Sequence, residues 1–206
     1  MRSITKTIVI AASTIALCLG LAACGGGQSS SADNAASSEK TAPAAQEESK
    51  DVDFYMFKGE MPEGYGLTGP NGNSSPLNIV EFRNIENPDK IVDIEIDEGS
   101  AQEQFDKAAA KDKYTAGDDV KLGKYTWKTL NFTWNKQPSV ILYTDIADGL
   151  YAEVTLYETT LDDAAVKAFL EGVEFATDYD AAHKAGMDTT VEKFAANNNL
   201  KLWEAK

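Results

Sequence analysis

The stretch from Tyr125 to Thr159, YTWKTLNFTW NKQP SVILYTDI ADG LYAEVTLYET, decides the fold of this chain. Aromatic and β-branched residues alternate with polar residues in three runs, which predicts strands at Tyr125–Trp134, Ser139–Ile146 and Leu150–Thr159. The links 135–138 and 147–149 are short and rich in turn-forming residues, as is typical of antiparallel hairpins. We therefore expect an antiparallel meander at the centre of the fold.

Upstream of the meander, the pattern predicts more strands. Apolar and polar residues alternate in Val52–Phe57, in Leu77–Asn84 and in Asp89–Asp97. The segment between the first two, Gly59–Pro76, is rich in Gly, Pro and Asn and is expected to be turn and loop.

Two helices are expected to cover the sheet. Ser100 and Glu103 fit a capping box at the start of one helix, and Thr160 is expected to cap a second. Both alternating sets of residues in the meander are apolar or aromatic, so helices should cover part of each face. The predicted class is α+β, with a mostly antiparallel sheet partly covered by helices on both faces.

Two short motifs extend this prediction. MPEGY (Met61–Tyr65) and FLEGVEF (Phe169–Phe175), in this order of elements, resemble the PsbP-like α/β/α sandwich. The resemblance implies a domain over residues 52–176 that acts as an assembly factor or binding module, with no catalytic residue carried over. Residues 177–206 depart from that pattern and are expected to form a helical C-terminal extension packed on the domain, with helices at Asp180–Ala185 and Thr189–Ala196.

The amino terminus has the features of an export signal. Residues 1–23 combine a positive start, a short apolar run and small residues at the end, which predicts a signal peptide. Leu21-Ala22-Ala23-Cys24 resembles the lipobox of bacterial lipoproteins. That resemblance implies that Cys24 carries lipid and becomes the amino terminus, so that the protein is anchored in the cell membrane and faces outside the cytoplasm.

A low-complexity segment follows the lipobox. Residues 24–51 are dominated by Gly, Ser, Ala, Gln and Glu and lack an apolar rhythm, which predicts a flexible tether. A coil of about 26 residues has a root-mean-square reach of roughly 28 Å.

Composition excludes several kinds of chemistry. The two cysteines are Cys18, in the signal peptide, and Cys24, so we expect no disulfide, no thiol catalysis and no cysteine zinc site in the mature protein. The net charge of −14 argues against nucleic acid as a partner. We expect a monomer with no cofactor and no metal.

Catalytic groups are hard to find in the sequence. His183 is the single histidine, lies in the extension and is expected to be exposed. Asp93, Glu95 and Asp97 share one strand face beside Glu98, where they would repel one another unless cations lay opposite. The candidates for these cations are Lys121, Lys124 and Lys128, or a calcium ion, and a solvated face is the default interpretation.

Aromatic residues with polar tips are the candidate partner-binding residues: Tyr125, Trp127, Tyr143, Tyr151 and Tyr157. The sequence pattern places Trp127, Tyr143, Tyr151 and Tyr157 on one face, and the opposite face would carry Leu130, Phe132, Trp134, Leu150, Ala152, Val154 and Leu156. These rings could stack on a polysaccharide or anchor a protein. The competing interpretation, which we favour, is that helices cover them.

The function predicted from the sequence is a non-enzymatic binding or assembly module for an envelope component or protein partner. A carboxylate-dependent extracytoplasmic hydrolase and a solute-binding lipoprotein of a transporter are the alternatives.

Overall fold

The predicted meander is present in the computed structural model, which describes residues 51–204. Strands β8 (Tyr125–Trp134), β9 (Gln137–Ala147) and β10 (Leu150–Tyr157) pair antiparallel in sequence order. The predicted signal peptide (residues 1–23), Cys24 and residues 25–50 of the predicted tether lie outside the described residues.

The turn between β8 and β9 is tighter than the four residues predicted. Only Asn135 and Lys136 form it, with φ angles of 47° and 68°. Two consecutive left-handed residues give the turn a twist that matches the twist of the strands. Pro138 therefore lies inside β9, opposite Thr133, and the predicted boundary at Ser139 is wrong.

The meander is part of an eight-stranded sheet. Strand β10 pairs with β5 (Ile91–Glu98), β5 with β4 (Val80–Asn84) and β4 with β3 (Tyr65–Thr68), all antiparallel. At the other end, β6 (Thr115–Ala116) and β7 (Val120–Leu122) both pair with β8.

Strand β3 lies in the segment that was predicted to be loop, and that prediction is wrong there. All four of its residues are buried, because β3 packs on the core while it pairs with β4. The segment around this short strand is rich in Gly and Pro, so its composition predicts a loop.

A second, small sheet contains β1 (Val52–Asp53), β2 (Phe57–Gly59) and β11 (Glu174–Phe175). The single strand predicted at Val52–Phe57 is wrong, because the chain reverses within it. Tyr55 has a left-handed φ of 69°, and the Phe54 amide donates a hydrogen bond to the Phe57 carbonyl at 2.8 Å.

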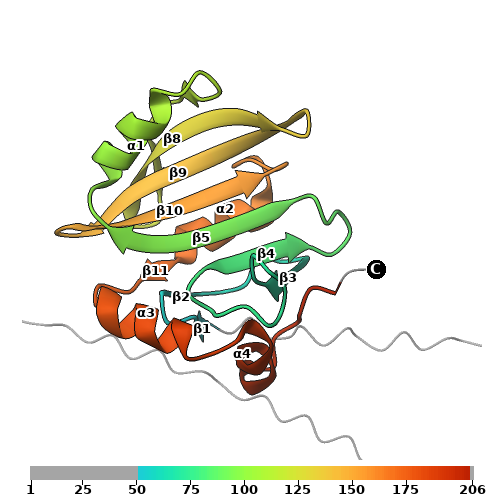
Figure 1. Ribbon diagram of the computed structural model, residues 1–206. Coiled ribbons are helices and arrows are strands. Elements are labelled where there is room, and N and C mark those ends of the chain that lie inside the picture. The colour runs from blue at the N-terminus through green and yellow to red at the C-terminus, as the bar shows by residue number, and fades with distance from the viewer. Residues whose placement is uncertain (1–50, 205–206) are drawn as a thin grey trace, which may run out of the picture. The chain divides into compact units, whose positions relative to one another are not determined.

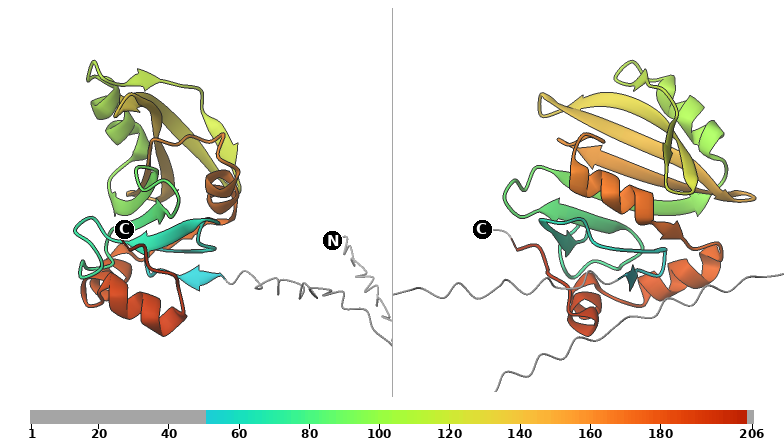
Figure 2. Two further views of the ribbon diagram at one scale, coloured as in Figure 1. Left: turned by 90° about the vertical axis from the view of Figure 1, so that its right-hand side faces the viewer. Right: turned by 180° about the vertical axis from the view of Figure 1, so that it is seen from behind.

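Helices lie on both faces of the large sheet, so the predicted α+β class is confirmed. Helix α1 (Ala101–Ala109) contacts β8, β9 and β10 on one face, and α2 (Ala164–Gly172) lies on the opposite face (Figures 1 and 2).

Both predicted caps are wrong in detail. Ser100 precedes α1 but its side chain makes no capping bond, and the Ala101 amide donates to Asp145 Oδ1 at 2.7 Å. Asp163, and not Thr160, caps α2 by accepting from the amides of Ala165 and Val166.

The main core lies between the large sheet, α2 and the small sheet. Its centre is a group of edge-to-face rings, among which Phe57 contacts Phe82 at 6.3 Å and Phe169 at 5.8 Å between centroids. A smaller cluster fills the space under α1 and includes Leu130, Ile141, Tyr143 and Tyr151.

The C-terminal residues contribute to the core. Helices α3 (Tyr179–Met187) and α4 (Val191–Asn198) stand close to the helices predicted there. Phe194 of α4 is buried against Phe54, with ring centroids 5.4 Å apart, and the Gly186 carbonyl of α3 accepts from the Leu77 amide at 2.9 Å. Within residues 51–204, no helix is long and apolar enough to span a membrane.

Candidate binding face

The large sheet carries a concentration of carboxylates on the face that α1 partly covers. Residues directly opposite in antiparallel strands point to the same side. Glu95 of β5 is opposite Glu153 of β10, and Asp93 is opposite Glu81 of β4. We call these four carboxylates, together with the neighbouring rings of Trp134 and Tyr157, the acidic–aromatic face. Figure 1 shows α1 at the β8 end of the sheet, where it contacts β8, β9 and β10, and shows β5 and β4 farther from this helix.

The carboxylates destabilise one another's charge. Burial, followed by the charges of Glu81, Glu95 and Glu153, raises the pKa of Asp93 from 3.8 to about 7. Burial and the Glu153 and Asp97 charges raise the pKa of Glu95 from 4.5 to about 7. Asp93 Oδ1 is buried and has no hydrogen-bond partner. The fold therefore disfavours the ionised forms of these carboxyl groups.

Hydrogen bonds support the face from within the sheet. The Tyr143 hydroxyl donates to the Glu153 carboxylate, and the Thr155 hydroxyl donates to Glu153 Oε1 at 3.3 Å. These bonds only partly offset burial, so the pKa of Glu153 is still raised.

The lysines predicted to neutralise this face do not do so. Lys128 stands in the same cross-strand row as Glu153 and Glu95, but its Nζ pairs with Asp119 at 3.6 Å. Lys121 donates to the Lys124 carbonyl, and Lys124 pairs with Glu174 at 3.6 Å. Two cations that the sequence did not point to act on the face: Arg83 of β4 binds Glu81 at 2.7 Å, and the Lys111 charge lowers the pKa of Glu153, opposing the effect of burial.

A row of rings borders the carboxylates. Trp134 contacts Tyr157 at 5.3 Å, Tyr157 contacts Phe132 at 6.0 Å, and Phe132 contacts Tyr114 at 5.6 Å between ring centroids. Trp134 is 48% exposed, while Tyr157 is half-buried. Burial and the Asp93 charge raise the pKa of Tyr157, which places this ring beside the carboxylates. The face therefore offers ring surfaces and negative charge together.

The predicted aromatic set is divided between two cores. Trp127 is fully buried in the main core, where its ring contacts Tyr125 and Phe175. Tyr143 and Tyr151 are 4% and 5% exposed and lie in the cluster that includes α1 residues. The coverage that we favoured applies to these three residues.

The predicted grouping of faces is wrong for β8. Each even-numbered residue of β8 pairs with an odd-numbered residue of β9, as in Lys128 opposite Tyr143, and a turn of either two or four residues gives this pairing. Leu130 and Phe132 therefore share the face of Tyr143, and Trp127 points to the other side.

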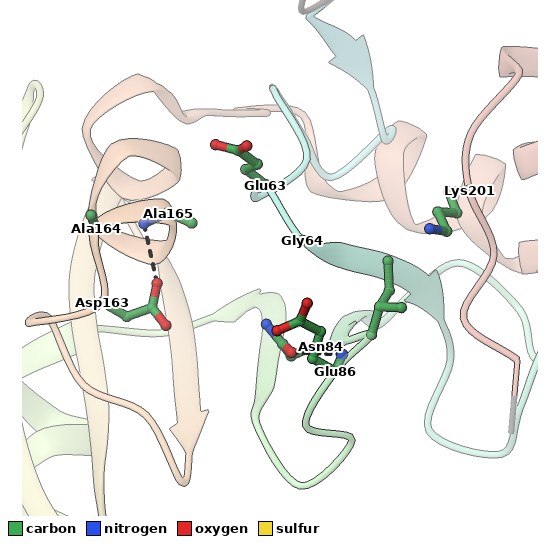
Figure 3. Close-up of a pocket in the computed structure, with 9 residues that line it drawn as sticks. Glu63, Gly64, Asn84, Glu86, Asp163, Ala164, Ala165 and Lys201 are labelled. Carbon is green, nitrogen blue, oxygen red and sulfur yellow. Dashed lines mark hydrogen bonds between the residues drawn. The ribbon is translucent and has the colours of Figure 1, made fainter. Parts of the chain in front are cut away.

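A separate open pocket of about 550 Å³ lies where the loop before β3, the β4–β5 loop and the start of α2 meet (Figure 3). Its carboxylates are Glu63, Glu86 and Asp163. Asp163 is already engaged, since it caps α2 and its Oδ2 lies 3.4 Å from Lys90 Nζ. Burial and the Asp163 charge raise the pKa of Tyr65, whose hydroxyl contacts the same oxygen, to about 12.

Neither the histidine nor a metal cluster adds a further candidate site in the described part of the chain. His183 is half-buried and stacks on Tyr179 with centroids 5.3 Å apart, so the expectation of an exposed histidine is wrong. In the described part of the chain, no three His, Cys, Asp or Glu side chains are arranged to hold a metal ion.

Comparisons with known proteins give distant structural matches. No family model and no curated protein sequence matches the chain. A Bacteroides thetaiotaomicron VPI-5482 protein of known crystal structure is 11% identical with a TM-score of 0.38, over 60% of this chain and 46% of its own. The solution structure of cyanobacterial PsbP from Synechocystis sp. PCC 6803 is 13% identical with a TM-score of 0.37, over 62% of this chain and 91% of its own. The chain is thus distantly similar in structure to PsbP.

Proposed function

We propose that this protein is a lipid-anchored extracytoplasmic binding or assembly module, and that its acidic–aromatic face holds a basic segment of a protein partner. The observation that carries the proposal is that three half-buried carboxylates and the buried Glu81 lie on the same sheet face as the exposed Trp134. A binding module needs a charged or ring-bearing surface of this kind and no reacting group.

Basic side chains fit this surface for two reasons. A lysine or arginine placed between Glu95 and Glu153 would favour their ionised forms and so recover the free energy that folding loses there. The Trp134 and Tyr157 rings present faces on which a guanidinium group stacks, worth about 0.5–1 kcal/mol at an exposed site. Arginine is therefore the preferred residue of the partner.

The anchoring part of the proposal depends on the lipobox-like Leu21–Cys24 and on the tether that follows. A flexible tether lets the domain reach a partner without a fixed orientation. In the producing cell, Cys24→Ser should move the protein out of the membrane fraction or leave it unprocessed. Normal processing with unchanged membrane retention would contradict the anchor.

The binding part is tested with a defined probe, hexa-arginine, by fluorescence anisotropy at pH 8. We expect Glu95→Gln with Glu153→Gln to weaken binding at least tenfold, and Trp134→Ala to weaken it about threefold. The matched control is Asp188→Asn with Glu192→Gln, which removes two charges from exposed positions on the α3–α4 side.

The control separates a specific face from general attraction to an acidic protein. Binding should fall with added salt in every variant, because the interaction is ionic. Equal losses of affinity in the two double variants would contradict the assignment of the face. Hexa-lysine tests the stacking of guanidinium groups on the Trp134 and Tyr157 rings, and it should bind more weakly than hexa-arginine.

A further inference from the structure

The chain end runs along the outer edge of the large sheet. Helix α4 ends at Asn199, which has a left-handed φ of 53°, and the segment Leu200–Trp203 continues beside β3. The Leu67 amide donates to the Lys201 carbonyl at 2.9 Å, and the Trp203 amide donates to the Leu67 carbonyl at 2.9 Å. Leu67 and Leu202 form a parallel β-bridge. The C-terminal segment, Leu200–Trp203, therefore acts as an added strand at this edge.

The edge is shaped for this segment. A Cβ atom on Gly66 would lie 2.7 Å from the Trp203 backbone nitrogen, so the close approach requires glycine. The Arg83 guanidinium lies 4.6 Å from the centre of the Trp203 ring, and Glu81 holds that guanidinium in place. The Asn73 side-chain amide donates to the Trp203 carbonyl at 3.4 Å. Backbone and side-chain features both select an extended chain with tryptophan at this position.

The segment is held less firmly than the rest of the domain. Lys201 is exposed, and Leu202 and Trp203 are only half-buried. Helix α4 has its own cap, so the segment can separate from β3 without unfolding the helix. Separation would leave the Leu67 amide and carbonyl unpaired. The β3 edge would then still fit another copy of the sequence Leu200–Trp203.

We propose that the β3 edge is a strand-addition site that its own C-terminal segment fills in cis and that the C-terminal segment of a second copy fills in trans. The occupant is a second copy because exchange recreates every contact that the monomer makes at this edge. Asn199, which follows the last residue of α4 and lies at the surface, serves as the hinge.

The site is tested in the full chain, kept in detergent, with a labelled peptide of residues 200–206. Trp203→Ala loosens the segment and should bind the peptide at least tenfold more tightly than wild type, whose site is filled in cis. Adding Gly66→Ala to Trp203→Ala should abolish binding, since the new Cβ blocks the approach. A scrambled peptide is the control. No binding to folded Trp203→Ala, or equal binding to the double variant, overturns the site.

Two measurements on wild-type protein need no weakened variant. Hydrogen exchange should be faster at the Leu67 amide than at Val92 in the sheet centre, and equal protection would overturn detachment. Two differently tagged copies, incubated together at high concentration, should co-purify. Gly66→Ala should prevent this exchange, and the absence of wild-type co-purification overturns filling in trans.

Discussion

The stability of this protein should depend on pH because of Asp93. The carboxyl group has a pKa of about 7 in the fold, against 3.8 in the unfolded chain. Between these values the folded state binds more protons than the unfolded state, so the free energy of unfolding falls as pH rises and levels off above about pH 7. From pH 5 to pH 8, Asp93 should lower the free energy of unfolding by about 2 to 3 kcal/mol, at 1.36 kcal/mol per unit.

Urea denaturation followed by tryptophan fluorescence at pH 5 and pH 8 measures this change. Asp93→Asn cannot ionise and should reduce the difference between the two pH values by about 2 to 3 kcal/mol. The comparison of pH values cancels any effect of the substitution that does not depend on pH. The control is Asp89→Asn, an exposed carboxylate in the loop before the same strand. If the free energy of unfolding changed between pH 5 and pH 8 by the same amount in Asp93→Asn as in wild type, the raised pKa of Asp93 would be refuted.

Three further pairs of substitutions test the packing and the α2 cap. Trp127→Ala should cost about 3 to 5 kcal/mol, whereas Trp127→Phe should cost about 1 kcal/mol, because the buried indole N–H has no partner to lose. Gly123→Ala should cost about 2 to 4 kcal/mol, since φ is +54° and the new Cβ would meet the carbonyl of the α2 residue Glu171. Gly149→Ala, with φ of +70° and no neighbour within 4 Å, should cost about 1 to 2 kcal/mol. Asp163→Ala should cost about 1 to 2 kcal/mol through loss of the α2 cap, and exposed Asp162→Ala less than about 0.5 kcal/mol.

Chemical denaturation measures each of these costs. A cost for Trp127→Phe as large as that for Trp127→Ala would contradict the unpartnered indole N–H. Equal costs for the two glycine substitutions would mean that α2 yields at Gly123. A cost for Asp162→Ala that matches Asp163→Ala would contradict the cap.

The elements of this fold that the sequence predicts best are those that depend on local structure. Strands β8 and β10 begin at the residues predicted, because alternation and the Asp148-Gly149 turn act over a few neighbouring residues. The sequence does not predict the reversal of the chain at Tyr55, which depends on one residue's backbone angle, or strand β3, which tertiary contacts create. Neither event leaves a periodic signal in the residues around it.

The candidate face was only partly predictable. The acidic row on β5 was visible as alternating Asp and Glu, but Glu81 and Glu153 come from strands that are remote in sequence. Their approach depends on strand order and register. Likewise, the burial of Trp127 depends on the packing of α2, β7 and β11 around it, which no property of the residue itself reveals.

The sequence by itself determined the antiparallel meander and the α+β class, and it predicts the lipid-bearing Cys24 and the tether, because each depends on neighbouring residues. The tertiary structure alone decided which side chains share a face. Strand order and register place Glu81 opposite Asp93 and Glu153 opposite Glu95, and in a strand a shift of one residue would move a side chain to the opposite face. It also brought the chain end to β3, because the backbone groups at a sheet edge need partners that no local pattern can supply.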